Sequence, residues 1–173
     1  MHRSHKPVLL LALLAIVLAT HRPDPCIAEG LSRQQQSALA LSARDPFLAL
    51  ARDADVVAVM SLGSRRSYWA PRHDIILTEY RLVTTSTLHG LAPATLTVVE
   101  EGGEVGDVGL AVSDAMVFEL GKSYVLLLER RPNGLHVLRG IHGMRQLESA
   151  TRQSLLRDLG TVLEARLPKG QPR

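Results

Sequence analysis

Short apolar or alternating runs, separated by turns, dominate the middle of the chain. Residues 56–60 form a nearly continuous apolar run that ends at Gly63, as a buried strand does. From residue 76 to residue 85 apolar and polar positions alternate, which indicates a long strand with one face more polar than the other. Further strands are expected at three β-rich runs: residues 95–100, 124–128 and 135–138. This pattern favours a mainly β fold, a small antiparallel barrel or sandwich.

Two segments outside this region have the features of helices. Asp45 is suited to cap a short helix that begins with Pro46 and ends near Asp53. Near the C-terminus apolar residues recur at helical spacing, which predicts an amphipathic helix over residues 149–167. Its apolar stripe consists of Leu155, Leu156, Leu159, Val162 and Leu163. We expect this stripe either to pack on the β-domain or to contact a partner or a membrane surface.

The first 28 residues have the three-part pattern of a secretory signal peptide. A basic start is followed by an unbroken apolar run over residues 8–19, and then by a polar stretch that ends at Ala28. Cleavage after Ala19 and cleavage after Ala28 both fit; the alternative is an uncleaved anchor or a buried N-terminal helix. Cys26 raises the further alternative of a lipoprotein, although Asp-Pro precedes it where a lipobox needs small or apolar residues.

Charge and cysteine content change this picture once the signal peptide is removed. The 173-residue chain has a formal charge of +3, and residues 1–28 carry three of its basic residues and one of its acidic residues. The mature charge is therefore about +1, which argues against a dedicated nucleic-acid binder. Cleavage after Ala28 also removes the single cysteine, so that neither a disulfide nor a cysteine-based zinc site is possible.

Familiar catalytic motifs are absent from the sequence, which contains no HExxH, GxSxG, SxxK or Walker loop. One constellation could still serve a secreted metal-dependent hydrolase, because His73 and Asp74 are adjacent and His142 could meet them in space. Histidines without a paired i, i+4 partner are more often solvated or hydrogen-bonded than metal-bound. We therefore predict no metal site and no cofactor, and keep the hydrolase as an alternative function.

Glycine is concentrated in residues 102–109, whose sequence is GGEVGDVG. A phosphate-binding loop would lead directly into a helix, whereas the residues that follow here are strand-like. We therefore interpret four of these residues as structural glycines of a bulged, twisted β-connection. They are Gly102, Gly103, Gly106 and Gly109.

The best candidate for a binding site is the segment Gly63 to Asp74, which we expect to be a loop. Arginine and aromatic side chains, both favoured at binding sites, lie close together there. The candidate residues are Arg65, Arg66, Tyr68, Trp69 and Arg72. The alternative is a tryptophan that folds over an open barrel end, with the arginines solvated around it.

The order of several short motifs resembles that of small exported bacterial proteins of unknown function. These motifs, which together span residues 45–145, are Ala54-Asp55-Val56-Val57, Thr78-Glu79-Tyr80-Arg81-Leu82 leading to Leu88-His89-Gly90, GGEVGDVG, and residues 120–128. Some of those proteins are similar to the OB-type barrel of tissue inhibitors of metalloproteinases and netrin modules. The resemblance implies an OB-like fold, an exported setting and a protein-binding habit. Those inhibitors chelate the protease zinc with an N-terminal, disulfide-fixed cysteine, which has no counterpart here, so no inhibitory residue is carried over.

These observations predict four parts of the chain and one function. The parts are a signal peptide over residues 1–28, a flexible leader or weak helix over 29–44, an OB-like β-barrel over 45–145, and a C-terminal helix and tail over 146–173. The function expected is that of an exported, non-enzymatic module that binds a protein or a cell-envelope component, in the periplasm or outside the cell. No nucleic acid and no transmembrane span after cleavage are expected. A structural envelope protein that acts through its C-terminal helix is a further alternative.

Overall fold

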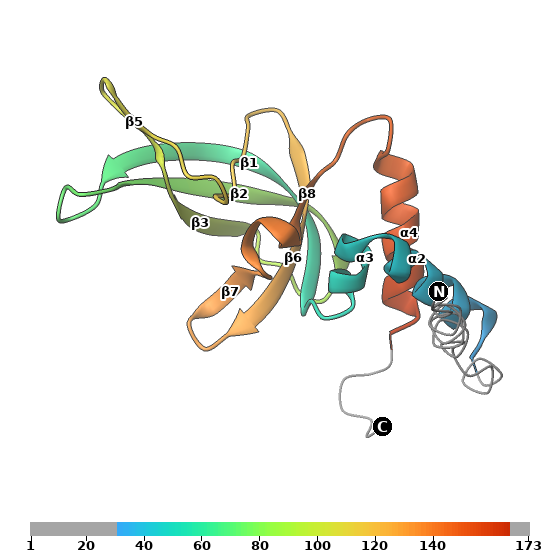
Figure 1. The fold of residues 1–173 in the computed structure, drawn as a ribbon. Coiled ribbons are helices and arrows are strands. Elements are labelled where there is room, and N and C mark those ends of the chain that lie inside the picture. Colours follow the sequence, from blue (N-terminus) through green and yellow to red (C-terminus); the bar gives the residue numbers. More distant parts are fainter. Residues whose placement is uncertain (1–30, 167–173) are drawn as a thin grey trace, which may run out of the picture. The chain divides into compact units, whose positions relative to one another are not determined.

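The computed structural model describes residues 31–166, and the predicted signal peptide, its two predicted cleavage sites and Cys26 lie outside the described residues. The described elements belong to the compact unit that begins at Arg33 (Figure 1). They are mainly antiparallel strands, accompanied by helices near both ends of the unit, which confirms the mainly β fold class. Between residues 31 and 166, no helix is long and apolar enough to cross a bilayer.

Six strands form the main sheet in the order β3-β2-β1-β6-β7, with β8 also paired to β6. Their bounds are β1 Val56–Trp69, β2 Ile76–His89, β3 Thr95–Glu101, β6 Ser123–Arg131, β7 Gly134–Val137 and β8 Met144–Gln146. Two short strands, β4 Gly103–Val105 and β5 Val108–Leu110, form a separate hairpin. In the described part of the chain, β3 at one end of the main sheet pairs only with β2, so the sheet is open and is not closed as a barrel.

The first half of β1 is buried on both faces because β1 and β6 lie between two hydrophobic clusters. Side chains alternate along a strand, so Val57 and Val59 enter one cluster while Val56, Ala58 and Met60 enter the other. The neighbouring strand β6 is divided between the same two clusters. Burial on both sides explains the nearly continuous apolar run in this part of the sequence.

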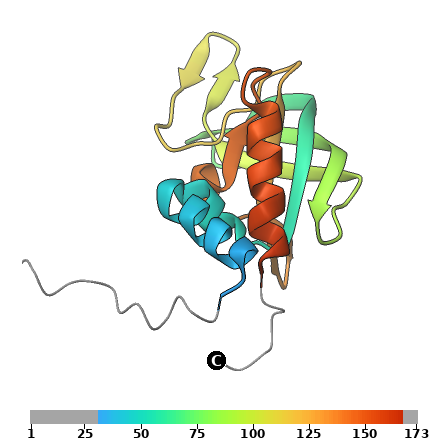
Figure 2. The ribbon, with the colours of Figure 1, turned by 90° about the vertical axis from the view of Figure 1, so that its right-hand side faces the viewer.

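Three helices lie together on one side of the sheet (Figures 1 and 2). They are α2 Arg33–Arg44, α3 Pro46–Ala51 and α4 Arg152–Glu164. Most of the predicted stripe of α4 is buried in the cluster that also holds Val57 and Val59. Leu159 and Val162 are fully inaccessible to solvent, whereas Leu156 is partly buried at the margin of this cluster. The packing alternative for this stripe is therefore confirmed.

The start of the described chain bears on two expectations. Of the two alternatives for residues 29–44, a flexible leader or a weak helix, the structure has a helix from Arg33 onward, because α2 buries Ala38 in the cluster shared with α4. The predicted cap of α3 is confirmed: the Phe47 N–H donates to Asp45 Oδ1 at 2.9 Å, and Pro46 occupies the first turn.

The other face of the sheet, here called the inner face, is covered by residues 111–122, a segment without helix or strand that we call the cover segment. Phe118 is buried at its centre and makes edge-to-face contacts with Tyr80 and Tyr124, each with ring centroids 5.1 Å apart. Two hydrogen bonds hold the cover segment: Met116 N–H to Glu100 Oε2 at 3.3 Å, and Glu119 N–H to the Tyr124 hydroxyl at 2.9 Å.

The segment Gly63 to Asp74 is not a loop over most of its length, which corrects the sequence-based expectation. β1 continues to Trp69 and pairs with β2, and only residues 70–75 form the turn. The register of the β1–β2 pairing shifts at Gly63. A Cβ at this position would lie only 3.0 Å from Cγ2 of Val83. The β1–β2 hairpin projects away from the helices (Figure 1).

Candidate binding site

Part of the predicted binding segment faces the inner side of the β1–β2 hairpin. After the register shift, Arg65 lies opposite Tyr80, and Ser67 lies opposite Thr78. All four side chains line one cleft beneath the cover segment. The pairing of two strands therefore places one arginine of the predicted site beside three polar side chains from both strands.

The same pairing directs the next residues to the outer face of the hairpin. Arg66 lies opposite Glu79, and Tyr68 lies opposite Leu77. Because successive side chains on a strand point to opposite faces, Arg65 and Arg66 cannot contribute to one patch. Arg66 and Glu79 are both exposed there.

The remaining predicted residues lie at the end of the hairpin. Trp69 is the last residue of β1, lies opposite Ile76 and is partly buried. Arg72 is exposed in the turn, where His73 adopts a left-handed conformation with φ of 57°. The five predicted residues are thus distributed over two faces and a turn, and the structure brings only Arg65 into the cleft.

The glycine-rich segment forms the β4–β5 hairpin, which lies against β1 and β2. Thr78 Oγ1 donates to the Gly102 carbonyl at 2.6 Å and shares a 2.8 Å hydrogen bond with Ser67 Oγ. Thr78 is only 3% exposed, so these bonds satisfy a buried hydroxyl. Gly103 has φ of 122°, and a Cβ there would collide with both hydroxyl oxygens. Glycine is therefore required where the chain crosses the Ser67–Thr78 pair.

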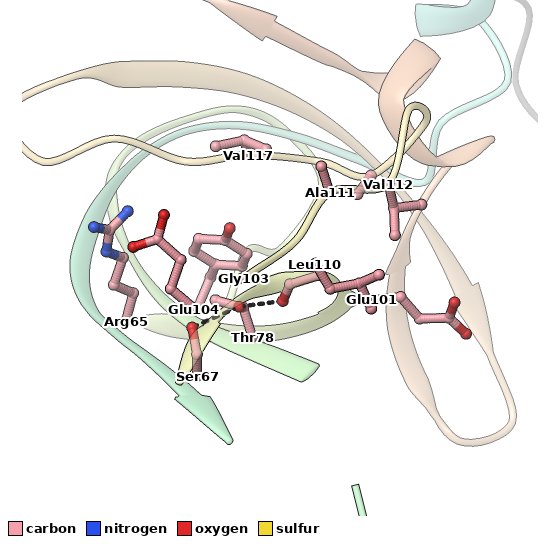
Figure 3. Close-up of a pocket in the computed structure, with 13 residues that line it drawn as sticks. Arg65, Ser67, Thr78, Glu101, Gly103, Glu104, Leu110, Ala111, Val112 and Val117 are labelled. Carbon is pink, nitrogen blue, oxygen red and sulfur yellow. Dashed lines mark hydrogen bonds between the residues drawn. The ribbon is translucent and has the colours of Figure 1, made fainter. Parts of the chain in front are cut away.

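The cleft between the two hairpins and the cover segment has a volume of about 490 Å³. Its polar lining consists of Arg65, Ser67, Thr78, Tyr80, Glu101 and Glu104, and its apolar lining includes Leu110, Val112 and Val117. In Figure 3, Arg65 and Glu104 lie on one side of the cleft and the bonded hydroxyls of Ser67 and Thr78 lie at its base. The cleft therefore offers charges of both signs around a hydrogen-bonded floor.

Burial changes the acidity of two groups near this floor. Burial raises the pKa of the Tyr80 hydroxyl. The positive charge of Arg65 acts in the opposite direction, and the negative charge of Glu100 raises this pKa further. Burial also raises the pKa of Glu100, while the hydrogen bond from Met116 N–H acts in the opposite direction. Tyr80 consequently stays a neutral hydroxyl that can donate or accept hydrogen bonds in the cleft.

A second, larger cavity of about 660 Å³ lies between α3 and the 3₁₀ helix η2 Gly140–Gly143. Arg145, one of the two arginines that line it, is already bonded to Asp45, and its guanidinium carbon lies 4.3 Å from the centroid of the Phe47 ring. This arginine holds the fold together, which makes the cleft at Arg65 the better candidate for recognition.

The structure does not bring the proposed hydrolase residues together. His73 and Asp74 lie in the turn of the β1–β2 hairpin, whereas His142 lies in η2, next to α3. Within residues 31–166, no group of three or more histidine, cysteine, aspartate or glutamate side chains could hold a metal ion.

Most residues of the cleft were not predicted from the sequence to be binding residues. Ser67, Thr78, Tyr80, Glu101 and Glu104 occupy ordinary positions in strands or beside glycines. The one sequence feature that could have indicated a site here was the glycine cluster between predicted strands. That feature does not reveal which strands pair with one another.

Comparison with known proteins adds no relative: no family model matches the chain, and neither a curated protein nor a solved structure matches it significantly.

Proposed function

We propose that the protein is an exported, non-enzymatic binding module, and that the cleft at Arg65 contacts a protein or a component of the cell envelope. The cleft is open, carries both an arginine and two glutamates, and has apolar side chains along one wall. Such a mixture suits a partner that presents polar and apolar groups together.

The observation that carries this proposal is the pair of hydrogen-bonded hydroxyls, from Ser67 and Thr78, at the base of the cleft. Ser67, Thr78 and the Gly102 carbonyl join three segments by hydrogen bonds of 2.6 and 2.8 Å. Side chains mounted on paired strands above such a floor are held in place before a ligand arrives, which lowers the cost of ordering them on binding.

Two finer features belong to the same proposal. The export signal is proposed from the sequence of residues 1–28, and the OB-type relationship from the motifs between residues 45 and 145. The pairing of β1 supports the OB-type relationship: β1 pairs with β2 along one edge and with β6 along the other, as in a sheet that curves around a core.

The neighbouring arginines provide a matched test. The purified protein is immobilised and incubated with envelope extract, and retained components are compared for wild type, Arg65→Ala and Arg66→Ala. We expect Arg65→Ala to lose a component that Arg66→Ala still retains at near wild-type amounts, because only Arg65 faces the cleft. Equal retention by all three proteins, with unchanged circular dichroism, would refute the proposal.

A further inference from the structure

β3 is the end strand of the main sheet, and its outer side carries backbone groups to which no other backbone group of residues 31–166 is bonded. Gly102 N–H donates to the Ile76 carbonyl, and Thr84 N–H donates to the Ala94 carbonyl, so even-numbered residues of β3 face β2. Thr95, Thr97, Val99 and Glu101 therefore direct their N–H and C=O groups away from the sheet. No backbone hydrogen bond found within residues 31–166 reaches these groups.

This edge has few of the features that normally prevent strand addition. β3 contains no lysine and no proline, and its pairing with β2 is regular over all seven residues, whereas the β1–β2 pairing has three register shifts. Four of the seven residues are β-branched, and Val99 is 48% exposed. Only Glu100 and Glu101 at the C-terminal end introduce charge.

The edge continues into the candidate cleft. Glu101 is the last residue of β3 and also lines the cleft, together with Gly102 and Glu104. A strand added to β3 would therefore pass directly from the backbone ladder to the cleft. Recognition of this type takes affinity from main-chain hydrogen bonds and specificity from a pocket for individual side chains.

Charge identifies the kind of occupant. Glu101 and Glu104 are exposed, and neither has an ion-pair partner within the described residues. A second copy paired antiparallel over the full length of β3 would place Thr95 opposite Glu101, and residues 90–97 contain no basic side chain. A parallel copy would place Glu101 beside Glu101. Neither pairing of two β3 strands brings a basic side chain to Glu101, which favours a segment of a different protein as the occupant.

We propose that β3 accepts an extended segment of a partner protein, with a lysine or arginine of that segment reaching Glu101. This proposal rests on the proposed binding function and names the form of its partner. The partner strand extends the sheet beyond β3, and its basic residue marks the end that enters the cleft.

The probe is a capped synthetic peptide, Ser-Lys-Val-Thr-Val-Thr-Val-Lys-Ser, titrated into isotope-labelled protein at low salt. Amide hydrogen exchange should slow by at least about tenfold at Thr97 and Val99, whose N–H groups are free, and remain unchanged at Val98, which already faces β2. A peptide with both lysines replaced by glutamate should bind at least about tenfold more weakly. Equal binding of the two peptides, or no added protection at Thr97 and Val99, overturns the proposal.

Two further variants separate edge binding from other modes. Thr97→Pro removes an outward N–H without removing a bond to β2 and should abolish peptide binding, whereas Thr97→Ala should keep it. A peptide N-methylated at alternate amides asks the same question without changing the protein, and should not bind. If the protein is instead a dimer that Thr97→Pro converts to a monomer, β3 is a self-association edge and the proposal is wrong.

The peptide-binding test of β3 and the retention test of Arg65→Ala can succeed or fail independently of each other. Loss of an envelope component in Arg65→Ala, with full retention by Thr97→Pro, would support the cleft and refute strand addition. Peptide protection of β3 with equal retention by Arg65→Ala and Arg66→Ala would refute the proposed cleft function while supporting the edge.

Discussion

Arg145 donates hydrogen bonds to both carboxylate oxygens of Asp45, and thereby joins β8 to the first turn of α3 across a separation of 100 residues. Asp45 also accepts from Phe47 N–H at 2.9 Å, so one carboxylate caps a helix and anchors it to the sheet. We expect Asp45→Ala, which removes both roles, to lower the free energy of unfolding by about 1–2 kcal/mol. Asp45→Asn, which keeps a capping oxygen, should cost less. Urea unfolding at neutral pH measures both, and an equal loss would show that the cap contributes nothing.

The same contact predicts a dependence on pH. The hydrogen bond from Arg145 is the largest cause that lowers the pKa of Asp45 in the folded protein. The stabilisation is therefore complete above the unfolded pKa of about 4 and is lost as the pH falls through the lower folded value. The stability difference between wild type and Asp45→Asn should shrink on acidification from about pH 6 to about pH 2. A difference that stays constant over this range would contradict the prediction.

Glu100 should have the opposite pH dependence. Burial raises the pKa of its carboxyl, so the folded state binds this proton more tightly than the unfolded chain. Its contribution to stability is greatest below the unfolded pKa and declines as the pH rises through the folded value. Glu100→Gln removes the titration and keeps an oxygen for Met116 N–H. We expect this variant to be at least as stable as wild type at pH 7, with a smaller advantage near pH 4; a clear loss at pH 7 would contradict this.

The close approach at Gly103 can be tested against a neighbouring glycine. Gly103→Ala should lower the free energy of unfolding by about 2 kcal/mol or more, because its Cβ collides with the Ser67 and Thr78 hydroxyls at a positive φ. Gly109→Ala is the control, since its Cβ makes only an ordinary contact with Glu104. Chemical denaturation should leave this control within about 1 kcal/mol of wild type. If Gly103→Ala lowers the free energy of unfolding no more than Gly109→Ala does, the collision is relieved by movement of β4.

The packing of α4 gives a prediction for the C-terminal part of the chain. Leu159 is fully buried, whereas Leu156 is only partly buried at the margin of the same cluster. Leu159→Ala should cost about 2–5 kcal/mol, and Leu156→Ala distinctly less. Thermal and urea unfolding of the two variants measure this difference. Equal costs would mean that the helix contributes through its length rather than through its buried stripe.

Several elements could be predicted because their cause is local in the sequence. The α3 cap depends on adjacent residues, the α4 stripe on a spacing of three and four, and β2 on strict alternation. β1 could not be predicted past Gly63, because its second half contains two arginines and two serines rather than an apolar pattern. These residues are in a strand because β2 pairs with them, and they are polar because no helix covers the outer face there.

α2 was difficult to predict for a related reason. Its sequence is rich in glutamine and serine and has few apolar residues, so its periodicity is weak. The helix is stabilised where Ala38 packs into the cluster shared with α4, a contact between residues far apart in the chain.

Three features could be predicted from the amino-acid sequence alone: the mainly β character of the protein, the capped helix at Asp45 and the buried stripe of α4. Each follows from residue type and short-range periodicity, which act over a few positions of the chain. Only the tertiary structure decided that Arg65 and Arg66 separate, that Thr78 meets Gly102, and that the outer side of β3 stays open. Those outcomes depend on strand register and on which elements cover which face, and a one-residue change of register reverses the face to which every side chain points.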